Sequence, residues 1–331
     1  MSAAPNRRAV AVILLVPLIV TLSLWAFSWP AARIAPRDLP VGIAGAAPAA
    51  DQLQSRFEQR EGAFEIHRYD DEAAARDAIE DRVVYGAVVV TGQGPRLLTA
   101  SAASPVVSQL LTEATKGAAP AGTAVPVTDV VAAPAADPRG AALGASILPL
   151  ALAGVAAGAL VTAMKLRGGR AVVSLAGASA LVGIAAAAVA HSWLGVVTGD
   201  WWTEAGAIGL TVLAIASGVG GLAALFGSKG IGVGALLMVL LGNSFSGVTS
   251  APELLPEPVG AIGQWLPPGA GGSLLRSVAF FDGATAGGAA LTLTVWASLG
   301  LAAVLIGGRR QPQAGSPAEP PGHRREPVLT G

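Results

Sequence analysis

The chain has 331 residues, of which 53% are hydrophobic and 13% charged, with 21 basic side chains, 21 acidic side chains and no cysteine. Soluble domains carry about 25% charged residues, and the mean hydropathy here is +0.60. The composition therefore excludes an ordinary soluble protein and indicates a membrane protein. The lack of cysteine also excludes disulfide bonds.

Six segments of mostly apolar residues without interior charges are long enough to cross a membrane. About 20 residues of α-helix span a hydrocarbon core about 30 Å thick. In lipid, each unpaired backbone group costs several kcal/mol, so such segments must be helices. We therefore predict an α-helical integral membrane protein with six transmembrane helices. The segments are residues 9–29, 143–164, 171–191, 206–226, 230–249 and 287–307.

The first apolar segment has two interpretations. Arg7 and Arg8 precede it and the small residues "AFS" lie near its end, which is also the pattern of a cleaved signal peptide. Its apolar run of about 19 residues exceeds the 7 to 15 of a typical signal core, which favours a retained anchor. Pro17 in its middle predicts a kink.

Residues 31–142 have a different character and predict an inserted α/β domain followed by a linker. Strands are predicted at "LPVGIAG", "AFEIHRYD", "VVYGAVVV" and "PRLLTAS". Helices are predicted at "AADQLQSRFEQR", "DEAAARDAIEDR" and "SPVVSQLLTEATK", the last with Ser104 as N-cap and Pro105 in its first turn. The Pro- and Ala-rich stretch that follows predicts an extended linker back to the membrane.

Basic residues in the short loops predict the orientation. If all six segments span, these residues fall on one side, which the positive-inside rule makes cytoplasmic. Both termini are then cytoplasmic, residues 31–142 are extracytoplasmic, and the Pro-rich residues 309–331 form a disordered cytoplasmic tail. The basic residues are Arg7, Arg8, Lys165, Arg167, Arg170, Lys229, Arg309 and Arg310.

The stretch after the fifth segment predicts a re-entrant cap, residues 250–283, over the outer mouth of a transmembrane domain of residues 143–308. It is too apolar for a solvated loop, and its prolines break any continuing helix, with "SLLRSVAFF" as a new helix that Ser273 starts. Non-helical backbone at membrane depth is tolerated where protein or a water-filled cavity surrounds it. The predicted outer gate residues are Pro252, Pro256, Trp265, Pro267, Pro268 and Arg276.

Polar residues inside the spans are few. Asn243, Ser244 and Ser246 form the most polar cluster within any span, and we expect them on a substrate path. No span has an ionisable residue in its middle, and Asp200 and Glu204 lie at the outer boundary, where a solvated role is expected. Ion-driven transporters keep such residues inside their spans. Any transport is therefore expected to draw its energy from elsewhere.

Known catalytic constellations are missing from the sequence. No G-x-x-x-x-G-K-[ST] motif occurs, and the three histidines lie in separate regions without cysteine. A pairing of Ser244 or Ser246 with His191 resembles an intramembrane serine protease, but no G-x-S-x-G motif supports it, and hydroxyls bonded to backbone are favoured. We expect no enzymatic activity and no cofactor bound by this chain.

This topology and the motif "GNSFSG", "PELLP", "LPPG", "LLRS", "FFDG" within residues 242–283 together resemble the type-two permeases of ATP-binding-cassette exporters. The chain is most similar to their YhgE/Pip-like (phage infection protein) branch. The resemblance implies export of a hydrophobic or amphiphilic molecule through the plasma membrane of a bacterium. It also implies a homodimer or heterodimer of permease chains, with ATP used by a separate P-loop ATPase subunit.

Two questions stay open at this point. Lys165, Arg167, Arg170 and Lys229 are candidate contacts for an ATPase, although charges that set topology need no partner. The alternative function is a membrane-anchored, secretion-associated or ligand-binding protein that acts through its extracytoplasmic domain. Its partners would be the lipid bilayer and a ligand, and neither interpretation includes nucleic acid.

Overall fold

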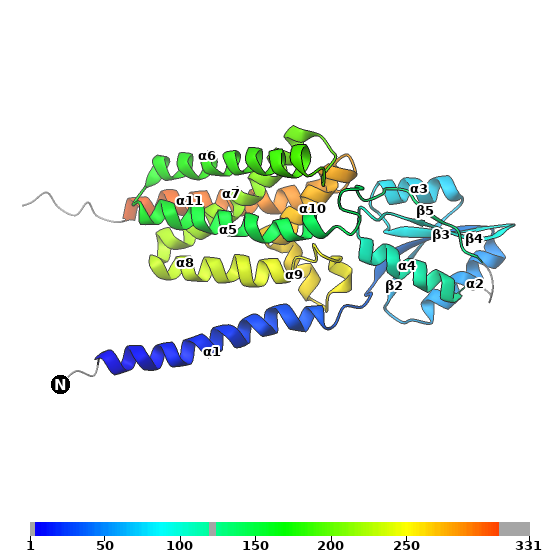
Figure 1. Ribbon diagram of the computed structural model, residues 1–331, viewed down its shortest axis with the longest axis horizontal. Helices are drawn as coiled ribbons and strands as arrows, with labels where there is room; N and C mark the ends of the chain where they lie inside the picture. Colours follow the sequence, from blue (N-terminus) through cyan, green and yellow to red (C-terminus); the bar gives the residue numbers. More distant parts are fainter. Residues whose placement is uncertain (1–3, 119–123, 311–331) are drawn as a thin grey trace, which may run out of the picture.

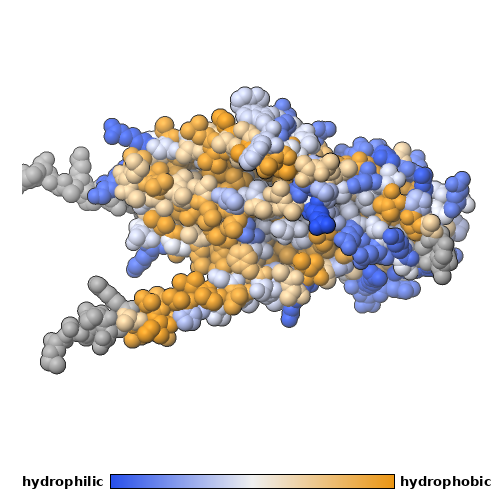
Figure 2. Space-filling view, viewed as in Figure 1, coloured by the Kyte–Doolittle hydropathy of each residue, from blue (hydrophilic) through white to orange (hydrophobic). Residues whose placement is uncertain are grey.

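The computed structural model describes residues 4–118 and 124–310, and it is mostly helical (Figure 1). A bundle of helices forms one part of the molecule, and a five-stranded sheet with its own helices is packed against one end of that bundle. Helix α1 stands apart along most of its length. Figure 2 shows apolar side chains over the bundle and α1, and hydrophilic side chains gathered over the sheet.

Five helices are long and apolar enough to cross a membrane, at five of the six predicted places. Helix α7 lies at the centre of the bundle, because 67% of its most apolar window is buried, against 22% for α6 and α11. The five are α1 (Ala4–Ala31), α5 (Ala141–Ala163), α6 (Gly168–Ala187) with its π-helical continuation η1 (Ala188–Trp193), α7 (Trp201–Phe226) and α11 (Ala286–Arg310).

The helix at the remaining predicted span, residues 230–249, is shorter than predicted. Its helix consists of α8 (Ser228–Ala235) and the π-helical η2 (Leu236–Gly242), and the last helical residue is Ser244. From Ser228 to Ser244 the helix is about 25 Å long, which is less than the thickness of a hydrocarbon core of about 30 Å. It ends because the Ser246 hydroxyl bonds to the carbonyl of Asn243 and Gly247 turns the backbone with φ +66°.

The sheet has the order β2-β1-β3-β4-β5, with strands and helices at each of the seven places predicted between residues 39 and 118. Neighbouring strands are parallel except β3 and β4, which form an antiparallel pair. The strands are β1 (Leu39–Gly45), β2 (Phe64–Tyr69), β3 (Gly86–Thr91), β4 (Gly94–Thr99) and β5 (Val127–Asp129). We call residues 39–131 the sheet unit.

Helices cover both faces of this sheet. Helix α3 (Glu72–Glu80) buries Ala75, Ala78 and Ile79 against one face, while α2 (Ala47–Glu58) and α4 (Pro105–Ala118) pack on the other. The predicted cap of α4 is confirmed, because the Val107 N–H donates to the Ser104 hydroxyl at 3.2 Å. Each face therefore has an apolar core of its own.

The predicted extended linker is partly wrong. Residues 119–123 of it lie outside the described residues, but β5 pairs with β4 through Leu97 and Val127, so the linker completes the sheet. The buried carboxylate of Asp137 then accepts the N–H groups of Ala141, Ala142 and Leu143. It thereby satisfies the free amides at the start of α5.

The Pro-rich stretch forms three short helices against the sheet unit. They are η3 (Pro252–Leu254), α9 (Val259–Trp265) and α10 (Pro267–Phe280). Pro267 and Pro268 break the helix as predicted, since α9 ends at Trp265 and Leu266 is extended, but the two prolines also form the first turn of α10, where proline needs no hydrogen-bond partner. Ser273 consequently lies inside α10 and does not start it.

The sheet unit and the helices share their cores. Phe281 is buried with residues of α3, and Ala251 and Leu254 are buried with residues of α2 and α4. The Ala35 N–H and the Arg37 guanidinium both donate to the carbonyl of Leu254. The Pro-rich stretch is thus the platform on which the sheet unit rests.

Two further predictions concern single regions. Glu204 is fully buried, and the expected solvated role at the boundary is therefore wrong. Of the predicted disordered tail, residues 309–331, the first two belong to the last turn of α11, and residues 311–331 lie outside the described part of the chain.

Candidate functional site

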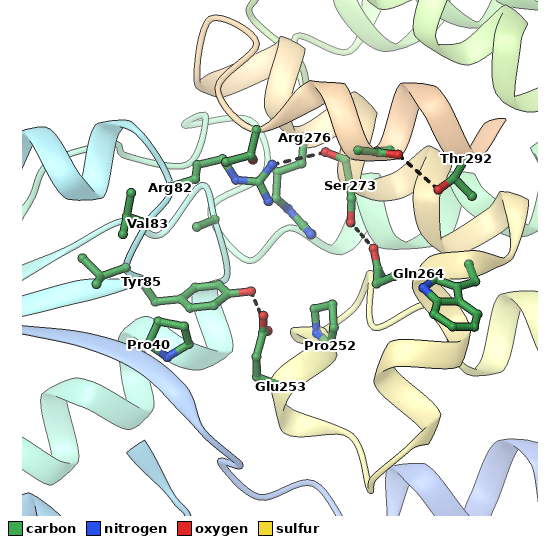
Figure 3. A pocket seen from close by; sticks show the side chains of 16 residues that line it. Pro40, Arg82, Val83, Tyr85, Pro252, Glu253, Gln264, Ser273, Arg276 and Thr292 are labelled. Atoms are coloured by element: carbon green, nitrogen blue, oxygen red, sulfur yellow. Dashed lines mark hydrogen bonds between the residues drawn. The ribbon is translucent and has the colours of Figure 1, made fainter. Parts of the chain in front are cut away.

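A cavity of about 490 Å³ lies where the sheet unit meets α9, α10 and α11 (Figure 3). The sheet unit contributes the turn that follows α3, and the Pro-rich stretch contributes polar side chains from three short helices. Its volume suits a small organic ligand. The polar and charged residues that line it are Arg82, Tyr85, Glu253, Gln264, Ser273, Arg276, Thr285 and Thr292.

Two guanidinium groups point into this cavity (Figure 3). Arg276, from the middle of α10, is 5% exposed and donates to the Val248 carbonyl at 2.8 Å, while its Nε–H has no partner. Arg82 is partly buried, donates to the Ser273 carbonyl at 3.3 Å, and lies 5.3 Å from the centre of the Phe281 ring. Burial lowers the pKa of Arg82 below its ordinary value.

Neither arginine is neutralised by a direct ion pair. Across residues 4–118 and 124–310, no acidic side chain lies within ion-pairing distance of Arg82 or Arg276. The acidic residue of the cavity wall, Glu253, instead accepts a hydrogen bond of 2.8 Å from the Tyr85 hydroxyl. The wall therefore carries two positive charges and one negative charge.

Tyr85 joins the sheet unit to the Pro-rich stretch through that hydrogen bond. Burial raises the pKa of the Tyr85 hydroxyl well above its ordinary value, and the neighbouring Glu253 carboxylate raises it further. The hydroxyl consequently stays protonated and donates at neutral pH.

Short helices position the other polar side chains. The Ser273 hydroxyl donates to the Gln264 amide oxygen at 2.6 Å, which ties α10 to α9. Ser273 and Arg276 are three residues apart on α10, so they share one face of that helix. This spacing presents a hydroxyl and a guanidinium to the same space.

A second hollow, a groove of about 440 Å³, lies between the C-terminal end of α1 and the bundle. Phe27, Pro30 and Ile34 form one wall, and the start of α5 forms another. The predicted path residues Asn243, Ser244 and Ser246 all line it. Apolar walls with a few hydroxyl and amide groups are typical of sites for small organic ligands.

Two hydrogen bonds connect the cavity with the groove. Gln264 lines the cavity, and its amide donates to the carbonyl of Ser246 at 2.8 Å. Arg276 likewise donates to the carbonyl of Val248, another residue of the groove. The backbone of residues 246–248 is therefore the partition between the two hollows.

The predicted gate residues do not all lie together. Pro252, Trp265 and Arg276 line the cavity. Pro267 and Pro268 are buried at the start of α10, where Pro268 closely approaches Gly242 of η2. Pro256 is buried and lines neither hollow, so half of the predicted gate has a packing role.

The four predicted ATPase contacts lie away from this site. Lys165 and Arg167 line a hollow of about 290 Å³ between α5, α7 and α11. Arg170 and Lys229 are exposed outside that hollow. Figure 1 shows the ends of α5 and α7 that carry this hollow at the end of the bundle opposite the sheet unit.

Sequence reasoning missed most of the cavity. Arg82, Tyr85, Glu253 and Gln264 were not among the predicted site residues. A charged residue between prolines in an apolar stretch, as at Glu253, is a signal that could have been used. Arg82 has φ +58°, a rare conformation for a residue with a side chain, and the sequence carries no mark of it.

Comparison with protein-family models, with curated proteins and with solved structures finds no match to this chain. Within the described residues, no group of three or more metal-ligating side chains comes together.

Proposed function

We propose that this chain is the permease subunit of an ATP-binding-cassette-type exporter for a hydrophobic or amphiphilic molecule. The groove between α1 and the bundle carries the proposal, because it combines an apolar wall with the hydroxyl and amide groups of Asn243, Ser244 and Ser246. Such a groove accepts an apolar chain on one side and a polar head on the other.

The proposed topology has six passes through a bacterial plasma membrane. The helix Ser228–Gly242 runs along the bundle towards the sheet unit, and the residues up to Ser250 would complete its crossing (Figure 1). Both ends of the described chain lie at the bundle end opposite the sheet unit, which supports cytoplasmic termini and an extracytoplasmic sheet unit. Helices α9 and α10 would then be re-entrant at the outer face.

Energy would come from a separate P-loop ATPase, since this sequence has no such motif. The exposed charges Arg170 and Lys229 at the far end of the bundle are accessible to such a subunit, and Lys165 and Arg167 lie beside them. A dimer with a second permease chain is part of the same proposal and rests on the resemblance carried by residues 242–283.

A second candidate, the membrane-anchored ligand-binding protein, is favoured by one observation. A hollow of about 530 Å³ lies on the sheet unit between α2 and α4, with Arg56, Arg60 and two phenylalanines in its wall. In that case the sheet unit would bind a ligand and the helices would serve as an anchor.

Affinity purification of the tagged full-length protein in mild detergent separates these candidates. We expect a stoichiometric P-loop ATPase, identified by mass spectrometry, whose activity rises in the complex. Replacing Lys165, Arg167 and Arg170 with alanine should remove it. A matched triple variant in the sheet unit, Arg68→Ala, Arg76→Ala and Arg96→Ala, should leave it bound. Recovery of an envelope component held by the sheet unit, with no ATPase, would contradict the permease.

A further inference from the structure

The cavity between the sheet unit and α10 has an unbalanced charge. Arg82 and Arg276 both line it, and Glu253 is the other charged residue of its wall. An unpaired charge removed from water costs several kcal/mol, and buried charges are therefore normally paired or bound to a ligand. Here the described residues provide no acidic partner within 4 Å of either arginine.

The hydrogen-bonding groups in the wall match an anion with several oxygens. The Arg276 Nε–H is buried without a partner, although the same guanidinium donates to the Val248 carbonyl. Arg82 uses one nitrogen for the Ser273 carbonyl. Guanidinium groups bind phosphate and carboxylate oxygens in pairs, and two of them facing one space suit an oxyanion with three or more oxygens.

The neighbouring groups limit which anions fit. The Glu253 carboxylate repels an anion, but its oxygen accepts the Tyr85 hydroxyl, which holds it on the side of the sheet unit (Figure 3). Ser273 and Gln264 lie on the opposite side as neutral polar groups. Positive charge in this wall is therefore concentrated beside neutral hydrogen-bonding groups.

We propose that this cavity binds an anion of the phosphate class between Arg82 and Arg276. The volume of about 490 Å³ exceeds that of a bare phosphate and leaves room for a group attached to it. The cavity wall also has apolar members, Val83, Trp265 and Ala289, so the occupant is assigned as the phosphate headgroup of an amphiphile. That last assignment rests on the proposed function, whereas the anion site does not.

Binding measurements on the purified full-length protein test the site. Native mass spectrometry would compare phosphatidic acid with the zwitterionic phosphatidylcholine, and thermal unfolding in detergent would measure stabilisation by inorganic phosphate. We expect phosphatidic acid to bind at least about tenfold more tightly than phosphatidylcholine, because its phosphate monoester carries more negative charge and lacks the choline cation that the arginines would repel.

Four variants locate the binding. Arg276→Gln and Arg82→Gln should each weaken phosphatidic acid binding by about tenfold or more, and Arg276→Lys should retain part of it. Arg96→Gln, in an exposed arginine of β4, is the control and should bind as the original protein does. Arg82 is only partly buried, so we expect Arg82→Gln to fold. It therefore tests the site even if Arg276→Gln fails to fold.

Each result has a separate meaning. Equal binding of both lipids and no stabilisation by phosphate, or full binding by both glutamine variants, would overturn the site. Phosphate stabilisation that requires both arginines, without preference for phosphatidic acid, would support an anion site for free phosphate and overturn the headgroup assignment. Headgroup binding in a protein that recruits no ATPase would support the site and count against the exporter.

Discussion

The Nδ1 atom of His191 lies 2.9 Å from Oε2 of Glu204, whose side chain is fully buried at the start of α7. The other carboxylate oxygen accepts the Gly199 N–H at 2.7 Å. This pair ties the π-helical end of α6 to α7 across the loop that joins them. The surface offers a matched pair, His67 and Glu65, at 3.5 Å with 59% of the glutamate side chain exposed.

We predict that Glu204→Ala lowers the free energy of unfolding by about 2 kcal/mol, because it leaves the partly buried Gly199 N–H without its acceptor. Glu204→Gln should cost less, since its amide oxygen still accepts from Gly199. The control, Glu65→Ala, should change stability by less than about 0.5 kcal/mol. Thermal unfolding in detergent measures all three, and equal losses for Glu204→Ala and Glu65→Ala would refute the role of the buried pair.

Filling the groove should block an amphiphile. Ala145 is exposed on α5 and lines the groove, so Ala145→Phe places a ring in that space without entering the core. Labelling with a photoactivatable phospholipid, mapped by mass spectrometry, should mark the groove of the original protein and fall to background in Ala145→Phe. Ala178→Phe, at an exposed position of α6 outside the groove, should label like the original. Undiminished labelling in Ala145→Phe would exclude the groove as a lipid site.

Tyr85 should make stability depend on alkaline pH. Its pKa is raised in the folded protein, mainly by burial, whereas an unfolded tyrosine ionises near pH 10. Below pH 10 both states keep the proton and the Tyr85 contribution is constant. Above pH 10 the unfolded state loses the proton first, so stability falls as the pH rises.

We therefore expect Tyr85→Phe to reduce the loss of stability between pH 9 and pH 11. At neutral pH the same variant should lower stability by about 1 kcal/mol, because Glu253 loses its donor. The chain has one other tyrosine, Tyr69, whose pKa burial also raises, so Tyr69→Phe is the comparison. Chemical unfolding at a series of pH values checks this, and an unchanged alkaline slope in Tyr85→Phe would disprove it.

A glycine of α9 should be essential for packing of the Pro-rich stretch. A Cβ atom at Gly263 would lie 1.7 Å from the carbonyl oxygen of Phe245, closer than any contact allows. We expect Gly263→Ala to cost at least about 3 kcal/mol or to prevent folding. Gly206→Ala, with no neighbour within 4 Å in α7, should be neutral or stabilising by up to about 1 kcal/mol. Size-exclusion profiles and melting temperatures compare them, and similar profiles for both would contradict this close approach.

Four of the five strands and all three helices of the sheet unit were predictable because alternation and helical periodicity are local patterns, whereas β5 was predicted as linker. The same holds for the five long apolar helices, whose composition alone requires backbone hydrogen bonds to close within the helix. The end of α8–η2 was not predictable in this way. It depends on hydroxyl bonds to the backbone at Ser246 and on the close approach of Pro268 to Gly242, and an apolar run carries neither signal.

The sequence by itself determined that this is a helical membrane protein with a polar, strand-containing insertion, and it identified Arg276 and the Asn243–Ser246 cluster as worth inspection. Only the tertiary structure decided that Tyr85 meets Glu253, 168 residues later, and that Arg82 reaches α10 across 191 positions. Such contacts arise when separate units bury apolar surface against each other, as Phe281 and Leu254 do here. Residues that meet across an interface between two units show no periodic pattern in either segment. The charged cavity therefore could not be predicted from any one stretch of sequence.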